Sequence, residues 1–260
     1  MGILQSLNAC YAYRALIHNL TIRQLSARYR GSALGFLWTF LNPLLLVLVY
    51  SLVFTVYVRF EMESYTAFVF CGLVPWLWFT NSLSEGTNAI VGSGSLITKA
   101  MFPPEVLPVV SVLANLCNFL LTLPVLFLVL LVSGKPLGAA LIALPVVVVV
   151  QTLVILGLVM FLSALNVQFR DVQHLLANIL TFWFFLCPIL YPHTNVPDRL
   201  QFLNTVNFMS AITISYQDIL FHGRFPAWGP LAFVAAVGVA VLFVGDWLFR
   251  RNRETFAEWL

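Results

Sequence analysis

Six long runs of mostly apolar residues, nearly free of charged side chains, divide this chain of 260 residues. About twenty such residues are needed for a helix to cross the hydrocarbon core of a membrane. One soluble core could not hide so much apolar surface, because 61% of the residues are hydrophobic and only 9% are charged. The sequence therefore predicts an all-α polytopic membrane protein with six transmembrane helices. The predicted spans are 34–58, 65–85, 107–132, 138–164, 174–192 and 228–249.

The basic residues gather on one side of the predicted membrane. Nine of the thirteen lysines and arginines fall in the N-terminal segment, the C-terminal end and the loops after the second and fourth spans. Segments on the cytoplasmic side of membrane proteins carry such an excess of Lys and Arg. Because an even number of spans places both ends on one side, we expect the N and C termini to be cytoplasmic.

The sequence divides into three predicted regions. Residues 1–33 are too short and too polar to cross the membrane. Their arginines beside apolar residues are typical of an amphipathic helix that lies in the cytoplasmic interface. Residues 34–253 form the predicted transmembrane domain, and residues 254–260 form a cytoplasmic tail.

The connection between the fifth and sixth spans is long, yet residues 200–217 carry no charge. Their mixture of apolar and small polar residues favours one or two half-length helices that re-enter the outer leaflet. Irregular backbone at that depth must pack on protein or line a wet cavity. The alternative is an interfacial hairpin that lies flat outside the membrane.

Ionisable groups are almost absent from the predicted spans. Ion-coupled transporters need carboxylates, histidines or charged pairs inside the membrane, and voltage sensors need rows of arginine. Asp246 lies near the end of the last span, one helical turn before Arg250, and we expect these two to pair. The phosphate-binding loop of an ATPase is also absent, since Gly92-Ser93-Gly94-Ser95 lacks the Gly-Lys-Ser/Thr ending. Uphill transport would therefore need a motor on a separate polypeptide.

The four histidines and four cysteines are scattered, with no spacing typical of metal ligands or redox centres. No nucleophile, base and orienting residue form a recognisable set either. We therefore predict that this chain carries no catalytic residue, no metal site and no cofactor.

Aromatic residues make up 15% of the chain, and several fall along the first and fifth spans. Aromatic rings pack on the C–H faces of sugars and leave the hydroxyl groups to water, so these residues are candidates for a substrate path. The alternative is that the rings anchor helices at the lipid interface or pack against one another. The candidates are Trp38, Tyr50, Phe54, Tyr57, Trp183 and Phe184.

Four stretches stand in order along nearly the whole chain. The first holds Arg-Tyr-Arg-Gly-Ser at 28–32, and the second holds Gly-Leu-Val-Pro-Trp at 72–76 and Phe-Pro-Pro-Glu-Val-Leu-Pro at 102–108. The third holds Phe-Arg-Asp-Val at 169–172 and Pro-Ile-Leu-Tyr at 188–191, and the fourth is the segment 207–226. Together, in this order and at these places relative to the spans, they resemble the type-2 ABC transporter permeases that export O-antigen, capsule and teichoic acid polysaccharides.

The resemblance implies the transmembrane subunit of an ATP-driven exporter in a bacterial inner (plasma) membrane. Two copies would form a homodimer, in contact with two ATP-binding cassette subunits that carry the ATP and Mg²⁺. A lipid-linked polysaccharide would cross through a channel at the homodimer interface, and no nucleic acid is expected as a partner. Two alternatives are an exporter of a small hydrophobic drug or lipid, and a non-transporting membrane scaffold or passive scramblase.

The resemblance also assigns roles to charged residues near the cytoplasmic side, although each could be an ordinary interfacial charge. The predicted ATPase-coupling residues are Arg28, Arg30, Lys99, Glu105, Arg170 and Asp171. Asp171 is also placed to cap the helix of the fifth span. The predicted outer gate comprises Asn204, Asn207 and Phe208, with Phe208 standing where the family usually has proline.

Overall fold

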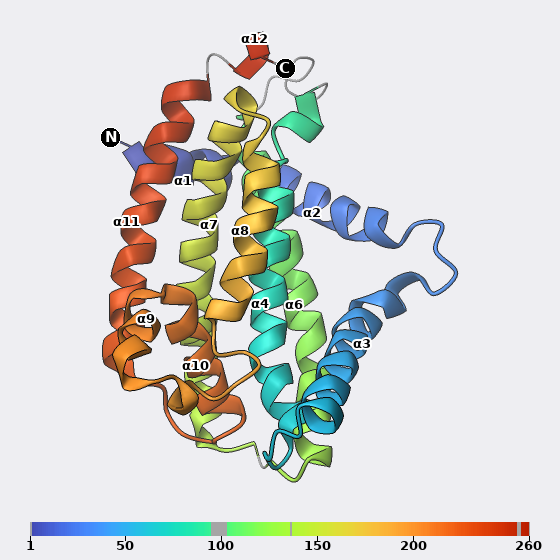
Figure 1. Cartoon of the computed structure of the whole chain (residues 1–260). Coiled ribbons are helices and arrows are strands. Elements are labelled where there is room, and N and C mark those ends of the chain that lie inside the picture. The colour runs from blue at the N-terminus through green and yellow to red at the C-terminus, as the bar shows by residue number, and fades with distance from the viewer. Residues whose placement is uncertain (1, 95–102, 136, 254–255, 260) are drawn as a thin grey trace.

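The computed structural model describes residues 2–94, 103–135, 137–253 and 256–259, and every regular element within them is a helix (Figure 1). Among these described residues, five helical segments are long and apolar enough to cross a membrane, and each overlaps one predicted span. These segments are Gly35–Tyr57, Tyr65–Thr87, Val106–Val132, Ala139–Gln168 and Trp228–Asn252. The predicted all-α fold is therefore confirmed, together with five helices able to span a membrane.

Two of the five segments are composite. The first joins a 3₁₀ turn, Gly35–Leu37, to α3, Trp38–Leu52, and a π-helical end, Val53–Tyr57. The fourth joins a 3₁₀ helix, Ala139–Ala143, to α7, Leu144–Gln168. The other three are α4, Tyr65–Thr87, α6, Val106–Val132, and α11, Trp228–Asn252. Further 3₁₀ turns occupy Val91–Ser93, His193–Asn195 and Asp198–Leu200.

The helix α4 lies inside the bundle and buries most of its length against α6 and α7. Several of its aromatic side chains are completely enclosed, among them Phe70 and Phe79. The buried amide of Gln151 in α7 donates a hydrogen bond of 2.9 Å to the carbonyl of Pro75 in α4. That bond satisfies polar groups that would be costly to leave unpaired in an apolar interior.

The helices α7 and α11 approach so closely that backbone touches backbone. A Cβ atom at Gly157 of α7 would lie 2.6 Å from the backbone nitrogen of Leu242 in α11. A Cβ atom at Gly245 of α11 would lie 2.3 Å from the carbonyl oxygen of Gly157. Glycine at these two positions lets the helices pack at short range, as small residues do in membrane helix pairs.

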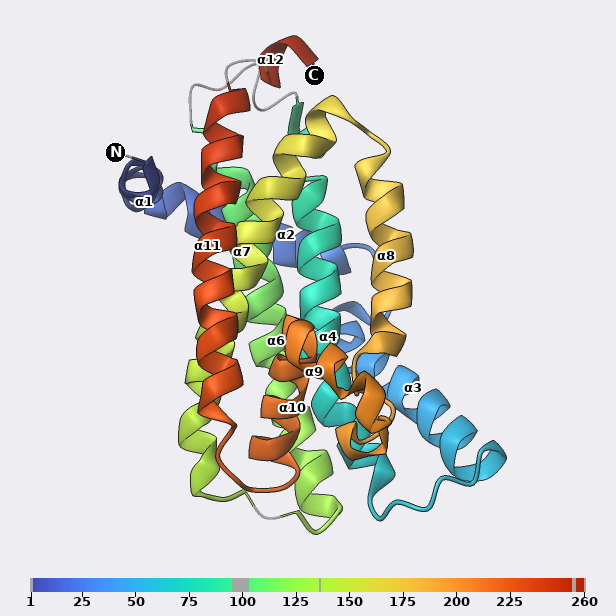
Figure 2. The same cartoon turned by 60° about the vertical axis from the view of Figure 1, so that its left-hand side comes forward.

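Two helices, α1, Gly2–Ala12, and α2, Arg14–Tyr29, precede the first span. They run across the bundle rather than along it (Figures 1 and 2). The predicted interface segment thus contains two helices that meet at Tyr13. The short helix α12, Phe256–Trp259, lies at the same end of the bundle, which we call the terminal end.

Polar contacts tie the terminal end together. The hydroxyl of Ser6 in α1 donates a hydrogen bond of 2.5 Å to Asp246 in α11. Asp246 also forms an ion pair of 2.8 Å with Arg250, which confirms the pair predicted from their spacing. Burial, with the nearby carboxylates of Glu105 and Asp246, raises the pKa of the Cys10 thiol in α1. That thiol therefore stays protonated at neutral pH.

The fifth predicted span, 174–192, overlaps α8, Val172–Leu186. This apolar helix has 15 residues, fewer than any of the five longer segments. Residues 187–190 then form a buried turn. A crossing by this segment stays a prediction.

Two short helices occupy the long connection 193–227: α9, Gln201–Val206, and α10, Phe208–Leu220. Nearly every residue of α10 is buried, where the helix packs on α4, α7 and α11. In contrast, α9 exposes Phe202 and Val206. The connection therefore contains half-length helices, and their re-entry into the outer leaflet stays a prediction.

The contact between α7 and α11 yields a test of the packing. We expect Gly245→Ala to lower the free energy of unfolding in detergent by about 3 kcal/mol, because the added methyl group overlaps the backbone of α7. The matched control is Gly229→Ala on the same helix, where a Cβ would meet nothing within 4 Å. Equal stability of the two variants would show that the close approach is absent.

Candidate functional site

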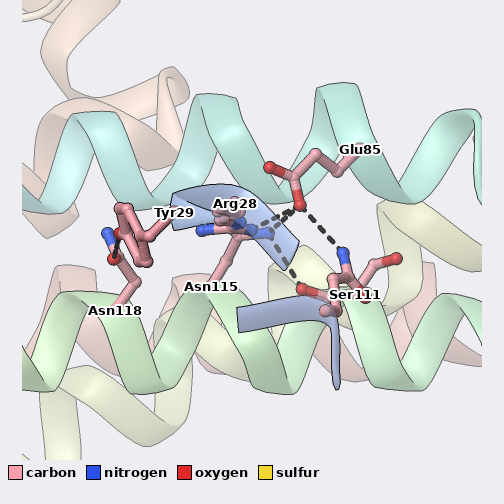
Figure 3. A network of polar contacts seen from close by, with 7 residues as sticks. Arg28, Tyr29, Glu85, Ser111, Asn115 and Asn118 are labelled. Atoms are coloured by element: carbon pink, nitrogen blue, oxygen red, sulfur yellow. Dashed lines mark hydrogen bonds and ion pairs between the residues drawn. The ribbon is translucent and has the colours of Figure 1, made fainter. Parts of the chain in front are cut away.

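Arg28, near the end of α2, joins three helices (Figure 3). Its guanidinium group forms an ion pair with Glu85 in α4. The same nitrogen donates a hydrogen bond of 2.9 Å to the side-chain oxygen of Asn115 in α6. A helix that lies across the bundle is thereby fixed to two helices that run along it.

The Glu85 carboxylate has further partners. It accepts hydrogen bonds from the side-chain amides of Gln24 at 3.0 Å and Asn115 at 3.1 Å. The Asn115 amide also donates a hydrogen bond of 2.9 Å to the backbone carbonyl of Ser111. Charged groups away from bulk water are tolerated where they are both paired and hydrogen-bonded, and Glu85 meets both conditions. We call Gln24, Arg28, Glu85 and Asn115 the clasp.

Tyr29, the next residue, extends these contacts to the first span. Its hydroxyl donates a hydrogen bond of 2.9 Å to the side-chain oxygen of Asn118 in α6 and accepts one of 2.5 Å from the hydroxyl of Thr39 in α3. The indole N–H of Trp38 donates a hydrogen bond of 3.1 Å to the hydroxyl of Ser32, in the turn between α2 and α3. Together with Arg28, Glu85 and Asn115 of the clasp, these side chains line a cavity of about 780 Å³ between α2, α3, α4 and α6.

The predicted coupling residues fall into two groups. Arg28 belongs to the clasp, and the buried Glu105 accepts 3.2 Å from Arg253 near the end of α11. Arg30, Arg170 and Asp171 are exposed, and within the described residues none of the three forms an ion pair. Lys99 lies outside the described residues. The first group holds helices together, and the second presents unpaired charge on the surface.

Asp171 occupies the position that precedes the first turn of α8, as the prediction of a cap requires. Its side chain makes no capping hydrogen bond there. The carboxylate therefore faces solvent, beside the exposed Arg170.

The predicted path aromatics do not form one set. Tyr50 of α3 stacks on Phe184 of α8, with ring centroids 5.6 Å apart. These two rings line a groove of about 440 Å³ between α3, α4 and α8. Phe54 stacks on Tyr65 at the start of α4. Trp38 lines the cavity beside the clasp instead, and Tyr57 is 75% exposed at the end of the first span.

Asn207, a predicted gate residue, connects α8 to α10. Its side-chain oxygen accepts a hydrogen bond of 2.8 Å from the indole N–H of Trp183 and one of 3.1 Å from the backbone N–H of Met209. The second bond makes Asn207 the N-terminal cap of α10. The ring of Phe208 meets Trp183 edge to face at 5.0 Å. Asn204 is half-buried in α9. Asn207, Phe208 and Trp183 thus meet, although they were predicted as parts of two different sites.

The sequence analysis did not predict the polar contacts between α4 and α6. Yet one signal was present, because Ser111, Asn115, Asn118 and Thr122 recur every three or four residues and share one face of α6. A polar stripe within an apolar span is costly in lipid and marks a helix face that meets protein or water.

Comparison with known proteins gives a consistent result. The model of a family described as "ABC-2 type transporter" matches residues 15–221. The "O-antigen export system permease protein RfbA" of Myxococcus xanthus is 44% identical over 250 residues, which cover 95% of this chain and 96% of that protein. A protein of the same name from Klebsiella pneumoniae is 28% identical over 259 residues, which cover 99% of both chains.

The clasp can be tested by a double-mutant cycle. We expect Arg28→Met to lower the free energy of unfolding by about 1 kcal/mol, because Glu85 loses its ion-pair partner and the pair is only partly buried. Combining it with Glu85→Leu removes the stranded charge, so the double variant should be more stable than Arg28→Met alone, as measured by denaturation in detergent. The control is Arg23→Met, since Arg23 is exposed on the same helix. A double variant that loses the sum of both single effects would contradict the pairing.

Proposed function

The chain belongs to the ABC-2 type transporter family, and we propose that it is the transmembrane subunit of an ATP-driven exporter of O-antigen polysaccharide. The observation that carries this proposal is the 44% identity, along nearly the full length of both chains, to an O-antigen export permease. Identity at this level over nearly the whole of both chains indicates a common fold. The substrate would be a lipid-linked glycan in the bacterial inner membrane.

We propose six crossings, with α8 in the fifth. A helix of 15 residues is about 22 Å long, shorter than the hydrocarbon core of about 30 Å. The buried turn 187–190 would complete the crossing against the protein rather than against lipid. The terminal end then faces the cytoplasm, in agreement with the excess of Arg and Lys in the segments that reach it.

The energy for export would come from two separate ATP-binding cassette subunits, which hold the ATP and Mg²⁺. Arg30, Arg170 and Asp171 are suited to contact them, because these side chains are exposed and unpaired within the described residues. Lys99 is proposed for the same surface. Arg28 and Glu105, which are held in ion pairs, would transmit a displacement of the terminal end to α4, α6 and α11.

The channel would form between two copies that meet across α3 and α8. Both helices expose long apolar rows, including Leu45, Leu48 and Leu52 on α3 and Ile179 and Phe182 on α8. The groove that holds Tyr50 and Phe184 lies between the same two helices. A homodimer would place two such grooves side by side, so that a glycan moves past aromatic faces.

The helices α9 and α10 would re-enter the outer leaflet and close the channel. The contact of Asn207 with Trp183 ties this segment to α8. A movement of α8 would therefore be felt directly at the outer gate, which also includes Asn204 and Phe208.

The proposal predicts ATP-dependent export that depends on the exposed charges. With the ATPase in proteoliposomes, we expect vanadate-sensitive movement of a lipid-linked O-antigen glycan. The double variant Arg170→Glu/Asp171→Lys should export several-fold more slowly at unchanged stability, because it reverses both charges at the ATPase contact. The control is Arg199→Glu, an exposed arginine outside the terminal end. Movement that needs no ATP would defeat the proposal and favour a scramblase.

The aromatic path predicts a second effect in the same assay. Tyr57→Ala removes an exposed ring and little packing, so we expect slower export of a long glycan with no change in stability. Leu128→Ala, an exposed apolar residue on α6 outside the proposed dimer face, is the matched control for loss of apolar surface. Equal export by both variants and the unmodified protein would remove Tyr57 from the path.

A further inference from the structure

The end of α11 and the helix α12 contact both connections that are proposed to meet the ATPase. The first connection, residues 88–105, joins α4 to α6, and the second connection, residues 169–171, joins α7 to α8. The helix α12 lies at the terminal end of the bundle, where α7 passes into α8 (Figures 1 and 2). A third segment is therefore placed to fix the two connections to each other.

Arg253 holds the end of the first connection. Its guanidinium group forms an ion pair of 3.2 Å with Glu105, the residue directly before α6. Glu105 is only 2% exposed, and its second carboxylate oxygen is buried without a hydrogen bond in the described part of the chain. A buried carboxylate depends on its paired cation, so Arg253 is what keeps Glu105 in this position.

The residue before Arg253 reaches the second connection. The side-chain amide of Gln168, the last residue of α7, donates a hydrogen bond of 3.1 Å to the side-chain oxygen of Asn252. Residues 169–171 follow directly, and they include the exposed Arg170 and Asp171. Two adjacent residues at the end of α11 thus attach to the two connections, one to each.

Phe256 of α12 packs between the same two connections. It is completely buried in one apolar cluster with Ile90, in the first connection, and Val167, next to the second. Leu107, at the start of α6, belongs to the same cluster. The ring of Phe256 meets that of Phe249 in α11 edge to face, with centroids 5.1 Å apart. Close-packed interiors yield little and transmit strain, so a displacement of one connection reaches the other through this ring.

We name Asn252, Arg253 and Phe256 the strap, and we propose that the strap joins the two connections so that the ATPase displaces them as one unit. The assignment rests on the proposed export function and adds positioning residues to it. Since α11 meets α7 at backbone distance through Gly245, the strap also ties the first connection to that rigid pair. Without the strap, ATP hydrolysis would displace each connection separately, and less of the movement would reach the bundle.

Amide hydrogen exchange on the protein in detergent tests the attachment independently of export. In the variant Arg253→Gln/Phe256→Ala we expect faster exchange in α12, in residues 88–94 and in the first turn of α6, because local opening there loses two contacts. The control is Arg251→Gln/Trp259→Ala, with exposed residues on the same two helices, which should exchange as the unmodified protein does. Unchanged exchange in residues 88–94, or faster exchange throughout α4 and α7, would overturn the proposal.

Proteoliposomes that also hold the ATPase test the positioning role, with glycan export and ATP hydrolysis measured on the same vesicles. We expect Arg253→Gln/Phe256→Ala to export about fivefold less glycan for each ATP hydrolysed, a change typical of residues that carry coupling between sites. The single variant Arg253→Lys keeps a cation beside Glu105, so it should export as the unmodified protein does, whereas Arg253→Gln should not. Export and hydrolysis that fall in proportion would indicate a merely structural role and overturn the assignment.

The unmodified protein keeps the two proposals apart in this assay. If it exports the glycan while the double variant moves as much glycan for each ATP, the strap alone fails and the export function stands. If it exports nothing, the export function fails, and the positioning role fails with it.

Discussion

The backbone contact between α7 and α11 is the constraint on which the rest of the structure depends. Because Gly157 and Gly245 leave no room between the helices, α7 and α11 form one rigid pair. The pair supports α4 and α10 on one side. It also anchors α1 through Asp246 and the 103–105 segment through Arg253. Helices joined at backbone distance gain van der Waals contact without any hydrophobic driving force.

A second layer, made of α2, α3 and α8, is held differently. Here polar contacts, chiefly the clasp and the contact of Asn207 with Trp183, act beside ring contacts such as that of Tyr50 with Phe184. Hydrogen bonds and ion pairs are directional and exchange partners readily, whereas close packing does not tolerate a shift. The protein thus combines a rigid block with a layer that has discrete polar attachments. That combination suits a machine in which one part moves against another.

Much of the fold follows from the sequence, because a bilayer demands about twenty apolar residues for each crossing. The limits of α8 do not follow, since the apolar pattern continues to Tyr191 while Pro188 disfavours helix at the residue before it. The pair of Asp246 and Arg250 was predictable because it is local. The clasp was not, as its contacts join residues 57 and 87 positions apart. Of the contacts of the clasp, the sequence indicates only that the polar face of α6 meets protein or water.

The exposed apolar rows of α3 and α8 have a consequence for assembly. In water such surfaces would drive association, but in a bilayer lipid chains cover them equally well. Two copies would therefore meet only as far as helix contacts exceed those made with lipid. Lipid therefore competes with the second copy for these surfaces. The equilibrium between monomer and dimer should shift with the lipid-to-protein ratio and with the thickness of the bilayer.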